Sequence, residues 1–197
     1  MFMKKILVAL LLLLLTSSCV SIVGLTDGYK SLSKEHKERC VDYDQLSPEA
    51  ISKIGRDNRV YSISAASLKE ALTKSDKRYQ LVYEFNPECT QDACIPISLF
   101  VSNCQEYAVE PYVLSRFYSE TLFNQPLIPA ALYVMDHRLY QSRYVFKYAP
   151  KFIWDLTNGA VDENDTKSEP YNMFLYEHGK FVKAFSGANY LKELELL

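Results

Sequence analysis

YQLVYEFNPECTQDACIPISLFVSNCQEYA, residues 79–108, predicts a strand, a loop and a helix in succession. The apolar run 79–85 has the length of a buried strand, and it stops at Asn86-Pro87, a pair of residues typical of turns. Cys89 and Cys94 follow, and helical spacing begins after Cys94. A thiol near a helix N-terminus lies close to unpaired N–H groups and the positive end of the helix dipole, which favour the thiolate. The cysteine pair is therefore the candidate site.

The helix after the second cysteine is indicated by one apolar stripe. Its members recur at the i, i+3, i+4 and i+7 spacing of a buried helix face. They are Ile97, Phe100, Val101, Cys104 and Ala108. Cys104 lies within the stripe, so we expect a small, buried and inert thiol there.

The first residues of the chain have the pattern of an export signal. Two lysines precede the apolar run 6–15, which is too short to span a bilayer, and Thr16-Ser17-Ser18-Cys19 follows. This pattern resembles the bacterial lipoprotein signal, with Thr16 where that signal prefers leucine. The resemblance implies that residues 1–18 are removed, that Cys19 becomes lipidated, and that the lipid anchors the protein to a membrane in the bacterial cell envelope. The alternative is an ordinary secretory signal with an incidental cysteine.

Charge and length limit what the exported chain can be. The sequence has 22 Lys and Arg and 24 Asp and Glu, and the leader takes two lysines with it, which leaves a net charge of about −4. No basic stripe is available for a phosphate backbone, so nucleic acid is not an expected partner. The remaining residues suffice for one domain. We expect a tether and short helical arm over residues 19–57 and the domain over 58–197.

The rest of the chain alternates strand and helix patterns. Strands are predicted at 59–63, 112–114 and 131–135, and helices after Ser64 and from Pro150. Two apolar runs flank Glu177-His178-Gly179-Lys180 and predict an antiparallel hairpin with the glycine in its turn. A final apolar face, with Tyr190, Leu191 and Leu194, predicts a closing helix.

This order of elements resembles the thioredoxin fold over residues 59–197. The resemblance implies an α/β domain with a central mixed sheet flanked by helices, and residues 122–167 as an insertion before the C-terminal hairpin. Phe85-Asn86-Pro87-Glu88-Cys89 resembles the approach to the redox site in thioredoxin-like oxidoreductases. Pro170, before the hairpin, resembles the family's proline that packs against the cysteine loop, and Pro129 is the competing assignment.

The resemblance also assigns roles to the candidate residues. Cys89 is the attacking thiol, Cys94 resolves the mixed disulfide, Pro170 shapes the edge that binds peptides, and Glu84 is the buried acid that moves protons to the resolving thiol. The implied partners are exported proteins or peptides with thiols or disulfides, and no cofactor is expected. The chain departs from the family in spacing, because four residues separate the cysteines where active members usually have two.

Several alternatives remain open at this point. The Cys89/Cys94 pair is equally consistent with a structural disulfide in a redox-inactive thioredoxin-like module that binds a protein or peptide. Cys40 is a further possible partner, since four cysteines besides Cys19 allow three complete pairings. No metal site is expected, because the three histidines, His36, His137 and His178, are isolated and no Cys-x-x-Cys motif occurs.

Overall fold

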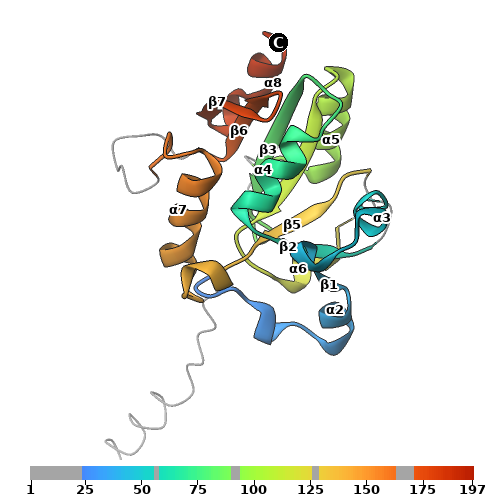
Figure 1. Ribbon diagram of the computed structural model, residues 1–197, viewed down its shortest axis with the longest axis vertical. Coiled ribbons are helices and arrows are strands. Elements are labelled where there is room, and N and C mark those ends of the chain that lie inside the picture. The colour runs from blue at the N-terminus through green and yellow to red at the C-terminus, as the bar shows by residue number, and fades with distance from the viewer. Residues whose placement is uncertain (1–23, 56–57, 90–93, 126–128, 163–170) are drawn as a thin grey trace, which may run out of the picture.

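A seven-stranded mixed sheet forms the centre of the computed structural model (Figure 1), which describes residues 24–55, 58–89, 94–125, 129–162 and 171–197. The strand order is β1-β2-β5-β4-β3-β6-β7. The first five strands are parallel to one another, and β6 and β7 form an antiparallel hairpin at the edge. The strands are β1 (Cys40–Asp42), β2 (Val60–Ile63), β3 (Tyr79–Phe85), β4 (Glu110–Ser115), β5 (Leu132–Met135), β6 (Met173–Glu177) and β7 (Lys180–Phe185).

Helices cover both faces of the sheet, so the expected α/β class is confirmed (Figure 1). The buried side chains of α4 and α7 form one core with the sheet, and those of α5, α6 and α8 form the other. Among the helices that the structure describes, none combines the length and apolar character needed to span a bilayer. The α-helices are α2 (Lys34–Glu38), α3 (Pro48–Ile51), α4 (Ala65–Thr73), α5 (Ile97–Glu106), α6 (Glu120–Phe123), α7 (Val145–Leu156) and α8 (Tyr190–Leu194). The 3-10 helices are η1 (Tyr29–Ser31), η2 (Tyr43–Gln45), η3 (Arg138–Tyr140) and η4 (Gly187–Asn189).

Strand β3 is the element that positions the cysteines. It occupies the residues expected from the sequence and pairs with β4 on one side and β6 on the other. Successive side chains of a strand point to opposite faces. Tyr83 and Phe85 accordingly belong to the core under α5, and Val82 belongs to the core under α4 and α7. The cysteine loop leaves the carboxyl end of β3 and returns into α5.

The long connection before the hairpin contributes to the sheet itself. Strand β5, expected at 131–135, lies between β2 and β4 and pairs with both. The helix expected to start at Pro150 instead begins at Val145, and Pro150 lies inside it. Val145 and Ala149 are buried in the core, so packing holds the first turn. The proline ring lacks the N–H that would bond one turn back, yet the flanking contacts keep the segment helical.

The described part of residues 19–57, which we expected to be a tether and arm, packs against the domain. Strand β1 pairs in parallel with β2, and Leu32 is buried. The backbone N–H of Asp27 donates to the carbonyl of Arg143 at 2.9 Å, and Tyr118 N–H donates to Asp27 O at 2.9 Å. The folded domain therefore includes residues from Gly24 onward, and the boundary expected at residue 58 is wrong.

Gly28 provides a test of this docking. Its φ is +73°, and a Cβ atom built on it would lie 2.0 Å from the carbonyl oxygen of Tyr118. We expect Gly28→Ala to lower the free energy of unfolding by more than the roughly 1–2 kcal/mol of a left-handed alanine, because the backbone of residue 118 must also move. Gly55→Ala is the matched control, since Gly55 has φ +82° but its nearest neighbours would lie at 3.3 Å. Equal losses in urea titrations of the two variants would contradict the docking.

Candidate functional site

Cys89 and Cys94 form a disulfide with their Cα atoms 6.1 Å apart. This distance lies within the range that a disulfide requires, even with four residues between the cysteines. Cys40 and Cys104 are free thiols, so the alternative pairings are excluded. Cys104 is fully buried within α5, as expected, and burial raises its pKa to about 12. The residues between the two bridged cysteines lie outside the described part of the chain.

The turn after β3 presents Cys89 to solvent. The N–H of Cys89 donates to the carbonyl of Asn86 at 3.1 Å, and the N–H of Glu88 donates to the Asn86 side chain at 3.1 Å. Proline suits the second position of such a turn, because its ring fixes φ near the required value. Pro87 is buried, whereas Cys89 is exposed. Asn86-Pro87 therefore anchors the turn, and Cys89 lies exposed at its end.

Cys94 is the inner cysteine of the pair. It is half-buried and precedes α5, which starts at Ile97 with Pro96 as its N-cap. Cys94 thus lies two residues before the cap, farther from the helix dipole than the sequence suggested, and the dipole effect is confined to the first turn. The hydroxyl of Tyr83 donates to the carbonyl of Ile95 at 3.2 Å. Burial raises the pKa of Tyr83 to about 12, so the hydroxyl remains a donor at neutral pH.

The segment that leads into β6 lies against the end of β3, just before the cysteine loop. Glu84 N–H donates to the carbonyl of Asn172 at 2.8 Å, and Gly187 N–H donates to the Asn172 side chain at 2.6 Å. A Cβ atom built on Gly187 would lie 3.1 Å from Ile95 and 3.1 Å from Asn172, so Gly187, at the start of η4, lies beside both residues. Pro170 itself lies outside the described residues, and its role stays a prediction.

Two other assignments are corrected by the topology. Pro129 precedes β5 at its amino end, and the cysteine loop follows β3 at its carboxyl end. Because β3 and β5 are parallel, the amino end of β5 and the carboxyl end of β3 lie at opposite ends of the strands. Pro129 is therefore remote from the cysteine loop. Glu84 lies two residues after Val82 in β3, so its side chain points to the same face of the sheet as Val82, away from α5. Its Oε1 accepts a hydrogen bond from Arg116 Nε at 2.5 Å. This geometry does not support Glu84 as the proton relay to Cys94.

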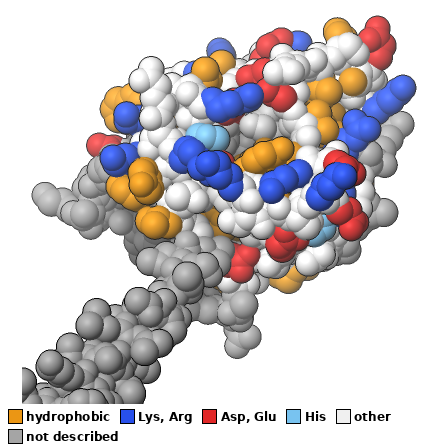
Figure 2. Space-filling model, turned by 90° about the horizontal axis from the view of Figure 1, so that it is seen from below, with side chains coloured by type: hydrophobic (Ala, Val, Ile, Leu, Met, Phe, Trp, Pro, Cys, Tyr) orange, Lys and Arg blue, Asp and Glu red, His pale blue; other side chains and the backbone are white. Residues whose placement is uncertain are grey.

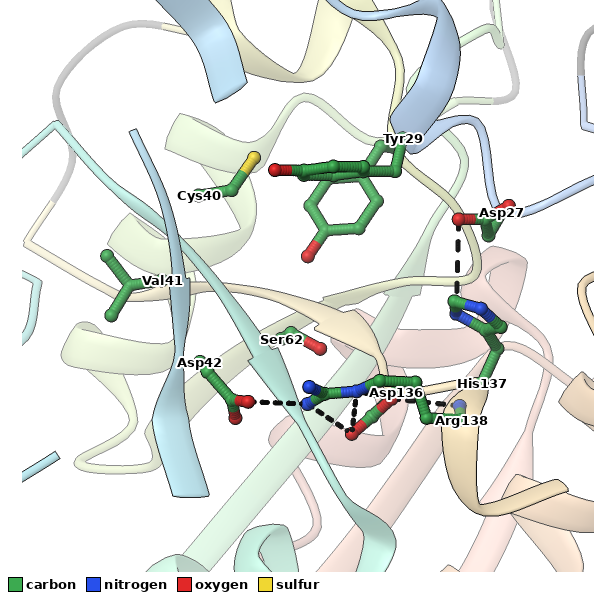
Figure 3. Close-up of a pocket in the computed structure, with 10 residues that line it drawn as sticks. Asp27, Tyr29, Cys40, Val41, Asp42, Ser62, Asp136, His137 and Arg138 are labelled. Carbon is green, nitrogen blue, oxygen red and sulfur yellow. Dashed lines mark hydrogen bonds and ion pairs between the residues drawn. The ribbon is translucent and has the colours of Figure 1, made fainter. Parts of the chain in front are cut away.

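A second polar site lies at the carboxyl ends of β1, β2 and β5 (Figure 3). It is a cavity of about 270 Å³, slightly below the roughly 300–1,000 Å³ of pockets that hold drug-sized ligands. Figure 3 shows Tyr29 and Cys40 on one side of it and the Asp136-His137-Arg138 segment on the other. Its lining residues are Asp27, Tyr29, Cys40, Val41, Asp42, Ser62, Tyr118, Asp136, His137 and Arg138.

Ion pairs hold the charged groups of this cavity in place. Arg138 donates to Asp136 with Nε and Nη2, and Nη2 also lies 2.7 Å from Asp42. Asp27 is buried and accepts from Arg143 Nε at 2.8 Å. Burial raises the pKa of the Cys40 thiol to about 12, so it is protonated at neutral pH. The wall of the cavity therefore carries the ion-paired side chains of Asp42, Asp136 and Arg138 and the neutral thiol of Cys40.

Sequence reasoning missed this cavity. Its signal was present, because Asp136-His137-Arg138 comes directly after the predicted strand 131–135. Polar residues at the carboxyl end of a parallel strand are where α/β proteins place their sites. The other wall comes from residues 27–42, which were assigned to the tether, so their position could not be inferred.

Asp136 gives a pH-dependent prediction. Burial raises its pKa, but hydrogen bonds from the side chain and backbone of Arg138 outweigh burial, and the net pKa is lowered. A lowered native pKa stabilises the fold above the unfolded pKa of about 4, and this contribution is lost as the pH falls through the native pKa. We expect Asp136→Asn to cost about 1–3 kcal/mol at pH 7 and nothing well below pH 3. Urea titrations at both pH values, with Asp44→Asn as the exposed control, measure the difference; a cost independent of pH would contradict it.

Comparisons with known proteins show only a distant structural similarity. No protein-family model and no curated protein matches the sequence. Among solved structures, the long form of thioredoxin f from spinach chloroplast matches at 13% identity and a TM-score of 0.29, over 77% of this chain and 92% of that chain. A similarity this distant says nothing about the site. The fold class rests on the order of strand, cysteine loop, helix, strand, hairpin and helix in the structure itself.

Proposed function

We propose that this protein is a thiol–disulfide oxidoreductase of the bacterial cell envelope, anchored through a lipid on Cys19, and that it acts on exported proteins or peptides. The observation that carries the proposal is the asymmetry of the cysteine pair. Cys89 is exposed at the end of a turn, whereas its disulfide partner Cys94 is half-buried. The rate of exchange depends on which sulfur an attacking thiolate can reach, and the difference in exposure favours attack at Cys89.

The exchange proceeds through Cys89. A substrate thiolate attacks Sγ of Cys89, the Cys89–Cys94 bond breaks, and Cys94 leaves as a thiolate that takes a proton from solvent. A second thiolate of the substrate then attacks the substrate sulfur in the mixed disulfide. The substrate leaves with a disulfide and the Cys89 thiolate is released, so two electrons pass to the pair. The same steps reversed reduce a substrate disulfide.

The neighbouring segments supply the support that such a loop needs. The hydroxyl of Tyr83 donates to the carbonyl of Ile95, and Gly187, which bonds to Asn172, lies beside the Ile95 side chain. These contacts hold the residue that follows Cys94, while Cys89 stays exposed. Pro170 lies outside the described residues, and the resemblance implies that it shapes the edge that binds a peptide substrate.

The reduction potential of the pair tests the proposal. The full chain is equilibrated in dithiothreitol or glutathione buffers, and the fraction of oxidised Cys89 and Cys94 is measured by alkylation and mass spectrometry. We expect a potential above about −300 mV, the range of exchangeable disulfides. A potential far below that value, with no exchange on a peptide disulfide, would mean a structural bond.

The second candidate function is a redox-inactive binding module with a structural disulfide. The cavity formed by Asp27, Asp42, Asp136 and their arginine partners favours it, because the cavity exists independently of the cysteine pair. This alternative predicts that a variant without the disulfide loses stability but keeps its binding partner. The potential measurement separates the two functions.

A further inference from the structure

The solvent-facing side of α7 carries an unusual row of apolar side chains. Phe146, Pro150 and Trp154 recur every four residues and therefore lie on one stripe. Phe146 is 61% exposed and Trp154 is 49% exposed, while the opposite side of the helix is buried in the core. Leu139, 65% exposed, lines the same hollow as Pro150 and Trp154. A helix on a water-exposed surface normally turns polar residues outward. Exposed apolar side chains in one row are instead typical of a surface that binds a membrane or another molecule.

This surface lies beside the first residues that the structure describes. The N–H of Val145, the first residue of α7, donates to the carbonyl of Leu25 at 3.0 Å, and Thr26 pairs with Tyr144. Leu25 and Tyr144 are themselves exposed, so they extend the apolar surface of α7. We name the group Leu25, Leu139, Tyr144, Phe146 and Trp154 the α7 surface.

The length of the chain upstream limits how far this surface can be from a membrane. Cys19 lies five residues before Gly24, the first residue that the structure describes. Five residues span at most about 18 Å when fully extended. The inference thus rests on the proposed lipidation of Cys19. If that cysteine carries the lipid, the bilayer begins within this distance of Gly24.

Charge on the same end of the molecule complements an anionic bilayer. Segments 24–39 and 136–147 together contain seven Lys and Arg and four Asp and Glu, although the whole chain is net negative. Figure 2 looks from below and shows Lys and Arg side chains gathered on that face, with exposed hydrophobic side chains beside them. Lys147 Nζ lies 5.6 Å from the ring centre of Tyr144 and 5.9 Å from that of Phe146. Lysines beside exposed aromatic rings are typical of surfaces that lie in a membrane interface.

We propose that the α7 surface inserts into the headgroup region of an anionic bilayer. The lipid on Cys19 holds the chain at the bilayer, and the α7 surface adds a second contact that places the domain against the headgroups. The apolar stripe of α7 lies along the interface, and Lys147 reaches the anionic headgroups. The domain is held in one orientation on the membrane.

Trp154 reports on this contact directly, because it is the only tryptophan in the chain. The full chain is produced with its leader in a bacterium, purified in detergent and reconstituted in phosphatidylglycerol-containing vesicles, with and without brominated acyl chains. We expect the emission of Trp154 to shift to shorter wavelength in both and to be quenched by the brominated lipid. Phe146→Glu, at an exposed position, is expected to abolish the quenching. Leu99→Glu is the control, because Leu99 is 50% exposed on α5, across the sheet from α7.

The outcomes separate this inference from the proposed anchor. Mass spectrometry of the mature N-terminus reports whether Cys19 carries a lipid. If Cys19 is lipidated and Trp154 is not quenched, the α7 surface does not insert into the bilayer, and the proposed anchor still stands. If Trp154 is quenched in a chain without a lipid on Cys19, insertion of the α7 surface is supported and the proposed lipid anchor is contradicted. A wavelength shift without quenching means that Trp154 is covered by protein, such as a second copy, and it overturns the inference.

Discussion

Cys89→Ser is expected to abolish thiol–disulfide exchange while the domain stays folded. The exposed sulfur of Cys89 is the atom that forms the mixed disulfide in the proposed reaction, and serine cannot replace it. Loss of the bridge costs roughly 2–4 kcal/mol of unfolding free energy, toward the lower end because the closed loop is short. The cores on both sides of β3 do not depend on the bridge. Reduction of a fluorescent peptide disulfide and a urea titration measure the two effects.

Cys94→Ser separates the two cysteines by role. Without the resolving thiol, the mixed disulfide between Cys89 and a substrate accumulates and appears as a higher-mass band on a non-reducing gel. Cys40→Ala is the matched control, because Cys40 is a free thiol on β1 and takes no part in the exchange. Exchange that persists in Cys89→Ser, or trapping through Cys40, would remove the proposed chemistry.

Arg143→Ala is expected to cause the largest loss of stability among the charge substitutions. Asp27 is 3% exposed, and its Oδ1 accepts from both Nε and Nη2 of Arg143. Removing the arginine leaves a buried carboxylate without its main compensation, which costs roughly 3 kcal/mol. The docked N-terminal segment should loosen first, because Asp27 also accepts the N–H of Tyr118 through its backbone. Amide hydrogen exchange of residues 24–42, together with urea titration, measures this loss.

Arg78→Ala is the matched control for this prediction. Arg78 also pairs with a carboxylate, that of Glu177, but both side chains are exposed to solvent. Exposed ion pairs contribute little to stability, so no measurable change is expected. If both variants lost stability equally, burial of Asp27 would not be the cause. If only Arg143→Ala loosened residues 24–42, the segment is held by the buried pair.

Local patterns predicted most of the elements. The run 79–85 became β3, the stripe from Ile97 to Cys104 became the buried side of α5, and Gly179 lies in the turn of the β6–β7 hairpin. Each of these three predictions depends on side-chain spacing or on a residue suited to a turn. A short segment of sequence contains all of that information. Pro150 misled the prediction of α7, because the core contacts of Val145 and Ala149 outweigh the missing hydrogen bond.

The candidate site was predictable in its cysteines and not in its surroundings. Cys89 and Cys94 are close in sequence, so a turn alone brings them within reach of a bridge. The supporting contacts from Tyr83, Asn172 and Gly187 join segments up to about a hundred residues apart. Glu84 was placed in the right strand, but its side chain faces the wrong side of the sheet because of strand alternation.

The sequence by itself determined the cysteine loop between a strand and a helix, and the closing hairpin, because each is encoded by neighbouring residues. Only the tertiary structure decided that β5 lies between β2 and β4, that residues 24–42 belong to the domain, and that Asp27 meets Arg143 across more than a hundred residues. Strand order and buried ion pairs depend on how surfaces from distant parts of the chain fit together. The spacing of side chains along the sequence does not show this fit.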